Sequence, residues 1–262
     1  MSSINSIGKI TLIYTLEKMR RGLTILVFTF LNITSAFNQS IYVGGLFPTI
    51  DHTGIISNKL EYSFYYFGAL PLINFKNPDI KKDPKLLLFY SEQGLTYKAA
   101  EQLSLSGSYV FQIEDVTKGS YLNEHRVHIQ ASYRHLERSL TFRHRLRFDN
   151  RFIYNRQTGK SPYTHRLRYL FKVDFPLKTS KSDMYFTAYE EAFFNTFKKP
   201  AAVYAENWAY AAIGKKLGDK NKIETGFLYI TWNTGSQNWF HQYYIQLTWI
   251  SEIDLKKDKK EY

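Results

Sequence analysis

The most regular hydrophobic pattern of the chain lies between Arg138 and Pro176, in two segments joined by a short polar break. In the first segment, apolar and charged residues alternate, so that each kind occupies positions of one parity, even or odd. The apolar positions are Leu140, Phe142, Leu146, Phe148, Phe152 and Tyr154, and the charged positions between them are Arg143, Arg145, Arg147, Asp149 and Arg151. The second segment repeats this with Tyr163, Leu167, Tyr169, Phe171, Val173 and Phe175 against Thr164, Arg166, Arg168, Lys172 and Asp174. A period of two predicts β-strands, because successive side chains point to opposite faces.

These two predicted strands are unusually long. They run for about 14 residues, whereas strands of soluble proteins usually have about 5–6. A tilted strand that crosses a bilayer needs about 9–11 residues. We therefore expect the apolar face to meet lipid and the arginines to line a closed barrel.

Eight further segments alternate in a similar way, at residues 57–69, 86–98, 102–113, 123–135, 183–195, 203–216, 222–232 and 239–250. Their connections are alternately long and short, as in outer-membrane barrels with short periplasmic turns. The prediction is an all-β fold: a single up-and-down antiparallel transmembrane β-barrel over residues 57–252, with about 10 strands. Twelve strands result if residues 41–50 also form strands. An even number would place both termini on the periplasmic side.

The N-terminal region has the features of an export signal. Met19-Arg20-Arg21 precede an apolar run from Leu23 to Ile33, and the small residues Thr34-Ser35-Ala36 follow. This order predicts a signal peptide over residues 19–36, cleaved after Ala36. Residues 1–18 are then expected to be a spurious extension, residues 37–56 an N-terminal lead-in with Gly44-Gly45 and Pro48, and residues 253–262 a charged C-terminal tail.

Composition fits an exported barrel. The mean hydropathy is −0.36, as expected when alternation averages the hydrophobicity of each strand. There are 21 Tyr and 20 Phe, which rings of aromatic residues at the membrane interfaces would explain. The chain has no cysteine, which excludes disulfides and thiolate chemistry.

The net charge is +12, and about +9 remains after residue 36. Nucleic acid is not expected as a partner, because no recognition motif accompanies the charge.

Several ordered motifs resemble a known family. They are Asn123-Glu124-His125-Arg126, the Arg-x-Arg pairs before Arg151-Phe152, the run from Tyr163 to Tyr169, Glu191-Ala192-Phe193-Phe194-Asn195, and the strand with Asn207. Together they are similar to the domain of unknown function 2490 family over roughly residues 57–250. The resemblance implies a Gram-negative outer-membrane β-barrel with no assigned activity. One departure is Asn207-Trp208, where the family tends to have Asn-Arg.

The candidate site is a charge network in the lumen. Its expected members are Glu124, Arg126, His128, Arg134, Arg143, Arg145, Arg147, Asp149, Arg151, Arg166, Arg168, Asp174, Glu191 and Glu206. A narrow barrel is filled by its own side chains, and arginine grips carboxylates with two parallel hydrogen bonds. The main reading is therefore an integral outer-membrane protein of unassigned role whose lumen is filled by this network.

Three alternative functions are also compatible with the sequence. An excess of arginine would suit a narrow anion-selective pore or a binding site for an anionic solute. The barrel could also be an accessory subunit of an envelope complex, with a protein partner besides outer-membrane lipid. An outer-membrane hydrolase using His128, Ser132 and Asp149 is the least favoured, since no nucleophile elbow or metal-binding spacing occurs. No enzyme activity, metal or cofactor is expected.

Overall fold

The computed structural model describes residues 41–74, 87–115, 121–177, 183–196, 204–233 and 239–256. The expected N-terminal extension and signal peptide, as well as residues 257–262 of the expected charged tail, lie outside the described residues. No helix among the described residues is long and apolar enough to cross a membrane.

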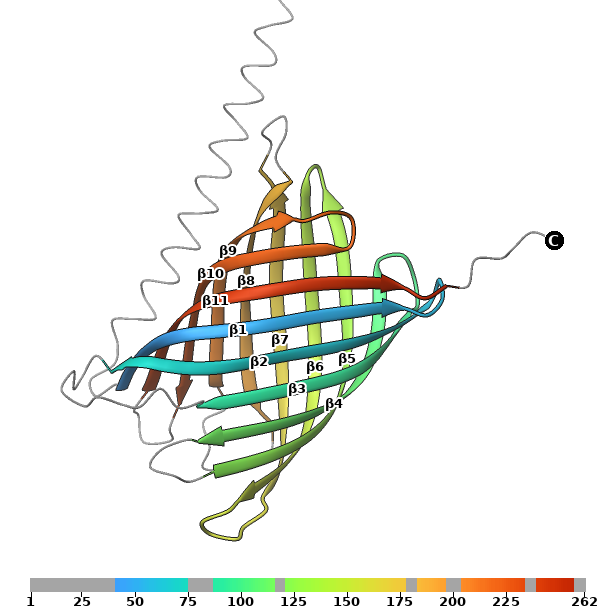
Figure 1. Cartoon of the computed structure of the whole chain (residues 1–262). Coiled ribbons are helices and arrows are strands. Elements are labelled where there is room, and N and C mark those ends of the chain that lie inside the picture. Colours follow the sequence, from blue (N-terminus) through green and yellow to red (C-terminus); the bar gives the residue numbers. More distant parts are fainter. Residues whose placement is uncertain are drawn as a thin grey trace, which may run out of the picture. The chain divides into compact units, whose positions relative to one another are not determined.

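Eleven long strands make up almost all of the described chain (Figure 1). They are β1 (Ile41–Ile55), β2 (Leu60–Asn74), β3 (Leu88–Lys98), β4 (Leu103–Asp115), β5 (Tyr121–Glu137), β6 (Leu140–Asn155), β7 (Tyr163–Pro176), β8 (Met184–Asn195), β9 (Tyr204–Lys216), β10 (Asn221–Asn233) and β11 (Trp239–Asp254).

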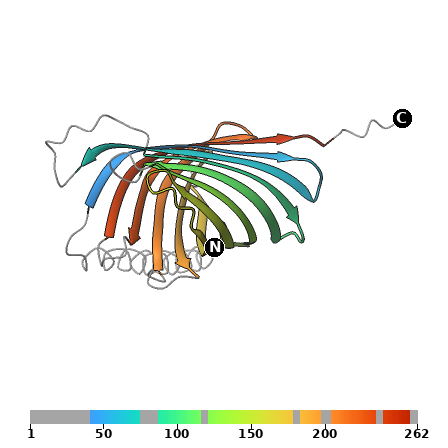
Figure 2. The same ribbon diagram turned by 90° about the horizontal axis from the view of Figure 1, so that it is seen from below.

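The strands form one closed barrel. Each strand pairs antiparallel with its sequence neighbour, and the barrel closes where β1 pairs with β11 in parallel. Figures 1 and 2 both show the blue first strand beside the red last strand. The prediction of an all-β, up-and-down barrel of about ten strands is confirmed, with one strand more than the segments counted in the sequence.

The extra strand is β1, so the expectation of an irregular lead-in over residues 37–56 is wrong for residues 41–55. Glycine and proline weaken a strand signal, yet here each has a defined place. The register of β1 on β2 shifts between Gly44 and Gly45, which marks a β-bulge. The pairs with β2 stop at Leu46 and resume at Thr49. Pro48, which has no amide hydrogen to donate, therefore falls in a gap of that ladder.

The parallel closure also shows that the first and last strands do not begin and end on the same side of the barrel, as an even number of strands would require. Because β1 and β11 run in the same direction, Ile41 lies at one rim and Asp254 at the other. One rim carries the longer connections, at residues 75–87, 116–120, 156–162, 196–203 and 234–238. The other carries four short connections, at residues 56–59, 99–102, 138–139 and 217–220, and a longer one at 177–183. We call these the long-loop rim and the short-turn rim.

The two faces of the wall are divided as the alternation predicted. The outward parity is apolar and exposed: Ile129 is 65% exposed and Leu146 51%. Phe142 and Phe171 stack on this outer face, with ring centroids 6.1 Å apart. The inward parity of β5, β6 and β7 holds the buried arginines and carboxylates. An apolar wall that faces out and a charged one that faces in is the reverse of a soluble sheet.

Another part of the lumen contains an apolar cluster. A cluster of buried side chains lies inside the wall formed by β1, β2, β3, β4, β9, β10 and β11. Phe67 stacks between Phe47 and Tyr90, with centroid distances of 4.7 and 4.3 Å. Leu228 and Tyr244 in the same cluster have no exposed surface. This packing is that of a protein core, so we name it the apolar half of the lumen.

Candidate functional site in the barrel lumen

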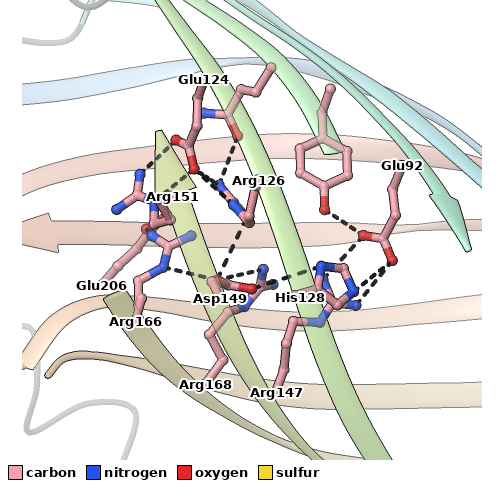
Figure 3. A network of polar contacts seen from close by, with 12 residues as sticks. Glu92, Glu124, Arg126, His128, Arg147, Asp149, Arg151, Arg166, Arg168 and Glu206 are labelled. Atoms are coloured by element: carbon pink, nitrogen blue, oxygen red, sulfur yellow. Dashed lines mark hydrogen bonds and ion pairs between the residues drawn. The ribbon is translucent and has the colours of Figure 1, made fainter. Parts of the chain in front are cut away.

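The charged half of the lumen is built on the inward positions of three adjacent strands. In the register of β5, β6 and β7, His128 is opposite Asp149, which is opposite Arg166. Two residues before Asp149 on β6, Arg147 is opposite Arg168 of β7. Strand pairing alone therefore places these side chains next to one another on one face. Figure 3 shows them close together, with the carboxylates Glu92, Glu124 and Glu206 of other strands around them.

Glu124 is the first of these carboxylates and is buried. Arg151 binds it with two parallel hydrogen bonds of 2.7 Å, from Nε to Oε1 and from Nη2 to Oε2. Arg126 donates from Nε to Oε1 at 2.8 Å and extends a further nitrogen to Gln112 Oε1 at 3.3 Å. Fork-shaped pairs of this kind fix the geometry of both partners.

Asp149 occupies the middle of the network and has no exposed surface. Arg166 Nε lies 3.3 Å from its Oδ2, and Arg126 and Arg168 each place a nitrogen 3.8 Å from the same atom. The Nδ1 atom of His128 is 3.9 Å from Oδ1. One carboxylate thus sits among three guanidinium groups, which repel one another without it.

Glu92 reaches the network from β3, across the lumen. Arg147 binds both of its oxygens, at 3.1 and 3.3 Å, and also donates to Gln130 at 2.9 Å. Tyr90 donates its hydroxyl to Glu92 at 2.5 Å, and His128 Nε2 is 3.3 Å away. The contact between β3 and β6 ties together two strands that are not neighbours in the sheet.

Two further carboxylates complete the network on β8 and β9. Glu191 receives two hydrogen bonds of 2.9 Å from Arg168 and one of 2.9 Å from Arg145. Glu206 receives one from Arg166 at 3.0 Å and one from the indole of Trp208 at 2.6 Å. Trp208 is the departure from the Asn-Arg pattern noted above, and in this chain its indole supplies a donor to the acid.

Phe193 separates the charges from the apolar half. Its ring lies under both Arg166 and Arg168, whose guanidinium carbons are 4.7 and 4.3 Å from the centroid. Phe193 is 1% exposed and also contacts Trp208, at 5.8 Å. Guanidinium groups are attracted to the face of an aromatic ring, so this side chain joins the two halves.

The charges in the network are almost balanced. Five carboxylates are each within 4 Å of at least one of six arginines, and each of these six arginines has a carboxylate partner. Every acid within the predicted set except Asp174 takes part. The small surplus of positive charge that the sequence suggested is largely offset by Glu92.

Three predicted members lie outside the network. Arg134 and Arg143 have the inward parity but are exposed near the short-turn rim, and neither forms an ion pair with a described residue. Asp174 is half-buried and pairs instead with Lys172, at 3.4 Å, and with Thr187, at 2.5 Å. Side chains alternate between the two faces up to the end of each strand. Near the rim, however, an inward-facing side chain is no longer enclosed by the rest of the barrel.

Residues that sequence reasoning missed are mostly on other strands. Glu92 has the expected polar parity of its segment, but no alternation reveals that β3 faces β6 across the lumen. Phe193 and Tyr90 are apolar or aromatic residues at inward positions, which the expectation of a wholly charged lumen left out. Only their parity could have pointed to them.

The candidate hydrolase residues are not all brought together by the described strands. Ser132 is four residues from His128 on β5, which is about 13 Å along a strand, so the structure does not bring the two together. His128 and Asp149 are fully buried between arginines. Nor is any group of three or more His, Asp or Glu side chains in the described part of the chain placed to hold a metal ion.

Comparisons with known proteins agree with the resemblance seen in the sequence. No curated protein matches the chain. The profile of the family described as "Protein of unknown function (DUF2490)" matches residues 80–241. This match spans β3 to β10 and contains every residue of the charge network, and the chain therefore belongs to the domain of unknown function 2490 family.

Proposed function

We propose that this protein is an integral outer-membrane β-barrel with a closed lumen, and that it serves the cell envelope as a membrane-embedded structural or accessory component. The observation that carries the proposal is the inverted wall: large apolar side chains in mid-strand are exposed outward, while arginines and carboxylates are buried inward. In water this arrangement would expose a continuous apolar surface to the solvent, which is unfavourable. In a bilayer the same surface would contact the acyl chains of the lipids.

The role of the charge network in this proposal is to close the lumen and to hold the wall together. Its contacts join β3, β5, β6, β7, β8 and β9 by side chains as well as by backbone hydrogen bonds. A wide passage for anions would need guanidinium groups without partners. Here each of the six buried or half-buried arginines is held by a carboxylate, so the geometry favours a plug over a pore.

The membrane location is tested with two isoleucines of the outer face. Ile129 lies in the middle of β5 and Ile253 at the end of β11, beside the short-turn rim, and they are 65% and 45% exposed. In a bilayer we expect Ile129→Arg to lower the free energy of unfolding by about 2–4 kcal/mol and Ile253→Arg by about 0–1 kcal/mol. Unfolding of the vesicle-reconstituted protein in urea measures both. Equal, small effects of the two variants would contradict a membrane location.

The closed lumen is tested by conductance. The purified protein in a planar bilayer should give no steady ionic current, because the network and the apolar cluster fill the space between the walls. A stable anion-selective current would instead support the alternative of a narrow anion pore. In either case the protein is expected in the outer-membrane fraction of a Gram-negative cell, where fractionation would detect it.

A further inference from the structure

The outer wall carries a groove that is separate from the lumen network. It has a volume of about 680 Å³ and crosses seven adjacent strands, from β8 through β9, β10, β11, β1 and β2 to β3. Figure 1 shows these strands side by side in one part of the wall. The groove crosses the seam where the barrel closes, so it belongs to the one place where β1 lies against β11.

The sides of the groove are apolar and outward-facing. Ile213, Leu247 and Phe89 are among its lining residues, and their exposed fractions of 47, 51 and 37% place them on the outer face. Between these side chains, the register aligns the smaller Thr225 with Leu247 and Leu247 with Pro48. Alternation of large and small side chains along one row is what hollows the surface.

One end of the groove is basic. Lys215 lines it beside Met184, in the row of residues nearer the short-turn rim. Residues 215–222, which form the end of β9, the turn and the start of β10, include four lysines and one aspartate. None of these four lysines forms an ion pair with a described residue. Among the described residues, no carboxylate lies within 4 Å of the Lys215 ammonium, whereas Lys220 interacts electrostatically with Asp254.

Trp249 lines the groove next to this basic end. Its indole Nε1 donates to Asn221 Oδ1 at 3.3 Å, which fixes the ring along the outer wall. Tryptophan favours the level of the lipid headgroups, where one side of the ring is apolar and the other wet. Lysine near a membrane surface attracts anionic headgroups. Trp249 and Lys215 lie two strands apart in one row of paired residues, because both are opposite Ile223.

We propose that this groove binds one acyl chain of an anionic phospholipid, with the phosphate held by Lys215 at the basic end. The proposal rests on the membrane location proposed above. Seven strands about 4.8 Å apart span about 29 Å, which exceeds the length of about 15 Å that one leaflet of a bilayer core provides for a chain. Because the basic end is at the short-turn rim, the bound lipid would be in the periplasmic leaflet.

The proposal is tested on protein reconstituted into vesicles of phosphatidylethanolamine and phosphatidylglycerol, extracted in mild detergent and weighed by native mass spectrometry. We expect one retained phosphatidylglycerol per barrel. Lys215→Gln should lower its occupancy about five-fold, and Thr225→Phe, which fills the floor of the groove, should lower it further. Lys160→Gln, a matched exposed lysine on the connection between β6 and β7, should leave it unchanged.

Three results would overturn the site. Equal retention of the two lipids would mean ordinary contact with the surrounding bilayer. Equal effects of Lys215→Gln and Lys160→Gln would remove Lys215 from the site. A dimer that carries no lipid and is lost in Thr225→Phe would assign the groove to a second copy of the chain. Flotation with the vesicles separates these results from a failure of the membrane location, because a protein outside the bilayer would not float.

Discussion

The two halves of the lumen are filled by opposite chemistry on the same scaffold. On β5 to β8 most inward side chains are arginines and carboxylates joined by ion pairs, whereas on β1, β2, β10 and β11 the inward positions include an aromatic and aliphatic cluster beside buried uncharged polar residues such as Gln242 and Thr248. Both halves are built from buried side chains, yet we expect them to tolerate substitutions differently. Truncating a side chain of the apolar cluster lowers the free energy of unfolding roughly in proportion to the contacts removed. Removing one member of a buried ion pair costs more, because the remaining charge is left buried without a partner.

The largest effect is expected in the charged half, from Asp149→Ala. Removing this carboxylate leaves Arg126, Arg166 and Arg168 close together without the acid between them, and breaking a buried pair costs about 3–5 kcal/mol. Urea unfolding followed by tryptophan fluorescence measures the loss. Asp174→Ala, which breaks a half-buried pair, serves as the control and should cost at most about 1 kcal/mol. Similar small losses in both variants would mean that water fills the charged half.

A somewhat smaller effect is expected in the apolar half, from Leu228→Ala. The side chain is fully buried, and its truncation should cost about 3 kcal/mol through lost contacts and the cavity left behind. The same unfolding measurement applies, and the barrel should stay closed to ions. If the variant conducted ions in a planar bilayer, the apolar cluster rather than the charge network would be the plug.

The boundary between the halves is expected to respond less. Phe193→Leu keeps an apolar side chain under Arg166 and Arg168 but removes the aromatic face, which should cost about 1–2 kcal/mol. A double-mutant cycle with Arg168→Gln would isolate the ring contact from simple packing. A coupling free energy near zero would show that the two halves are independent.

The smallest effect is expected at the rim, from Arg134→Gln. This arginine has the inward parity of the network but is exposed and forms no ion pair with a described residue, so the free energy of unfolding should change by no more than about 0.5 kcal/mol. Arg147→Gln, buried and bound to Glu92, is the matched comparison and should cost several times more. Equal effects would mean that the charged half extends to the rim.

The sequence predicted the charged half better than the apolar half, for a physical reason. Alternation is visible only when the two faces differ, as for Arg147 and Leu146 on β6. Where the inward residue is apolar as well, as with Leu228 on β10, both parities look alike and the inward face cannot be recognised. The closed barrel and the core members of the network were accessible from alternation, but Phe47, Phe67 and Tyr90 were not.

Two other features could not be read from the pattern. Strand β1 carries Gly44, Gly45 and Pro48, which weaken its signal, and its place in the sheet depends on pairing with β11 at the far end of the chain. Glu92 joins the network through a contact across the lumen, and the spacing of residues along one strand does not report on the opposite wall. Both depend on the closed geometry rather than on any local sequence.

The parallel seam between the first and last strands has a consequence for how the protein folds. Ile41 and Phe240 are paired although about 200 residues separate them, so this ladder forms only after the entire chain is available. Long-range parallel pairing is intrinsically slow, because the entropy of closing so large a loop is lost before any contact compensates for it. Until then β1 and β11 are two bare edges open to other chains, and a catalyst of assembly that shields them would be needed most at this step.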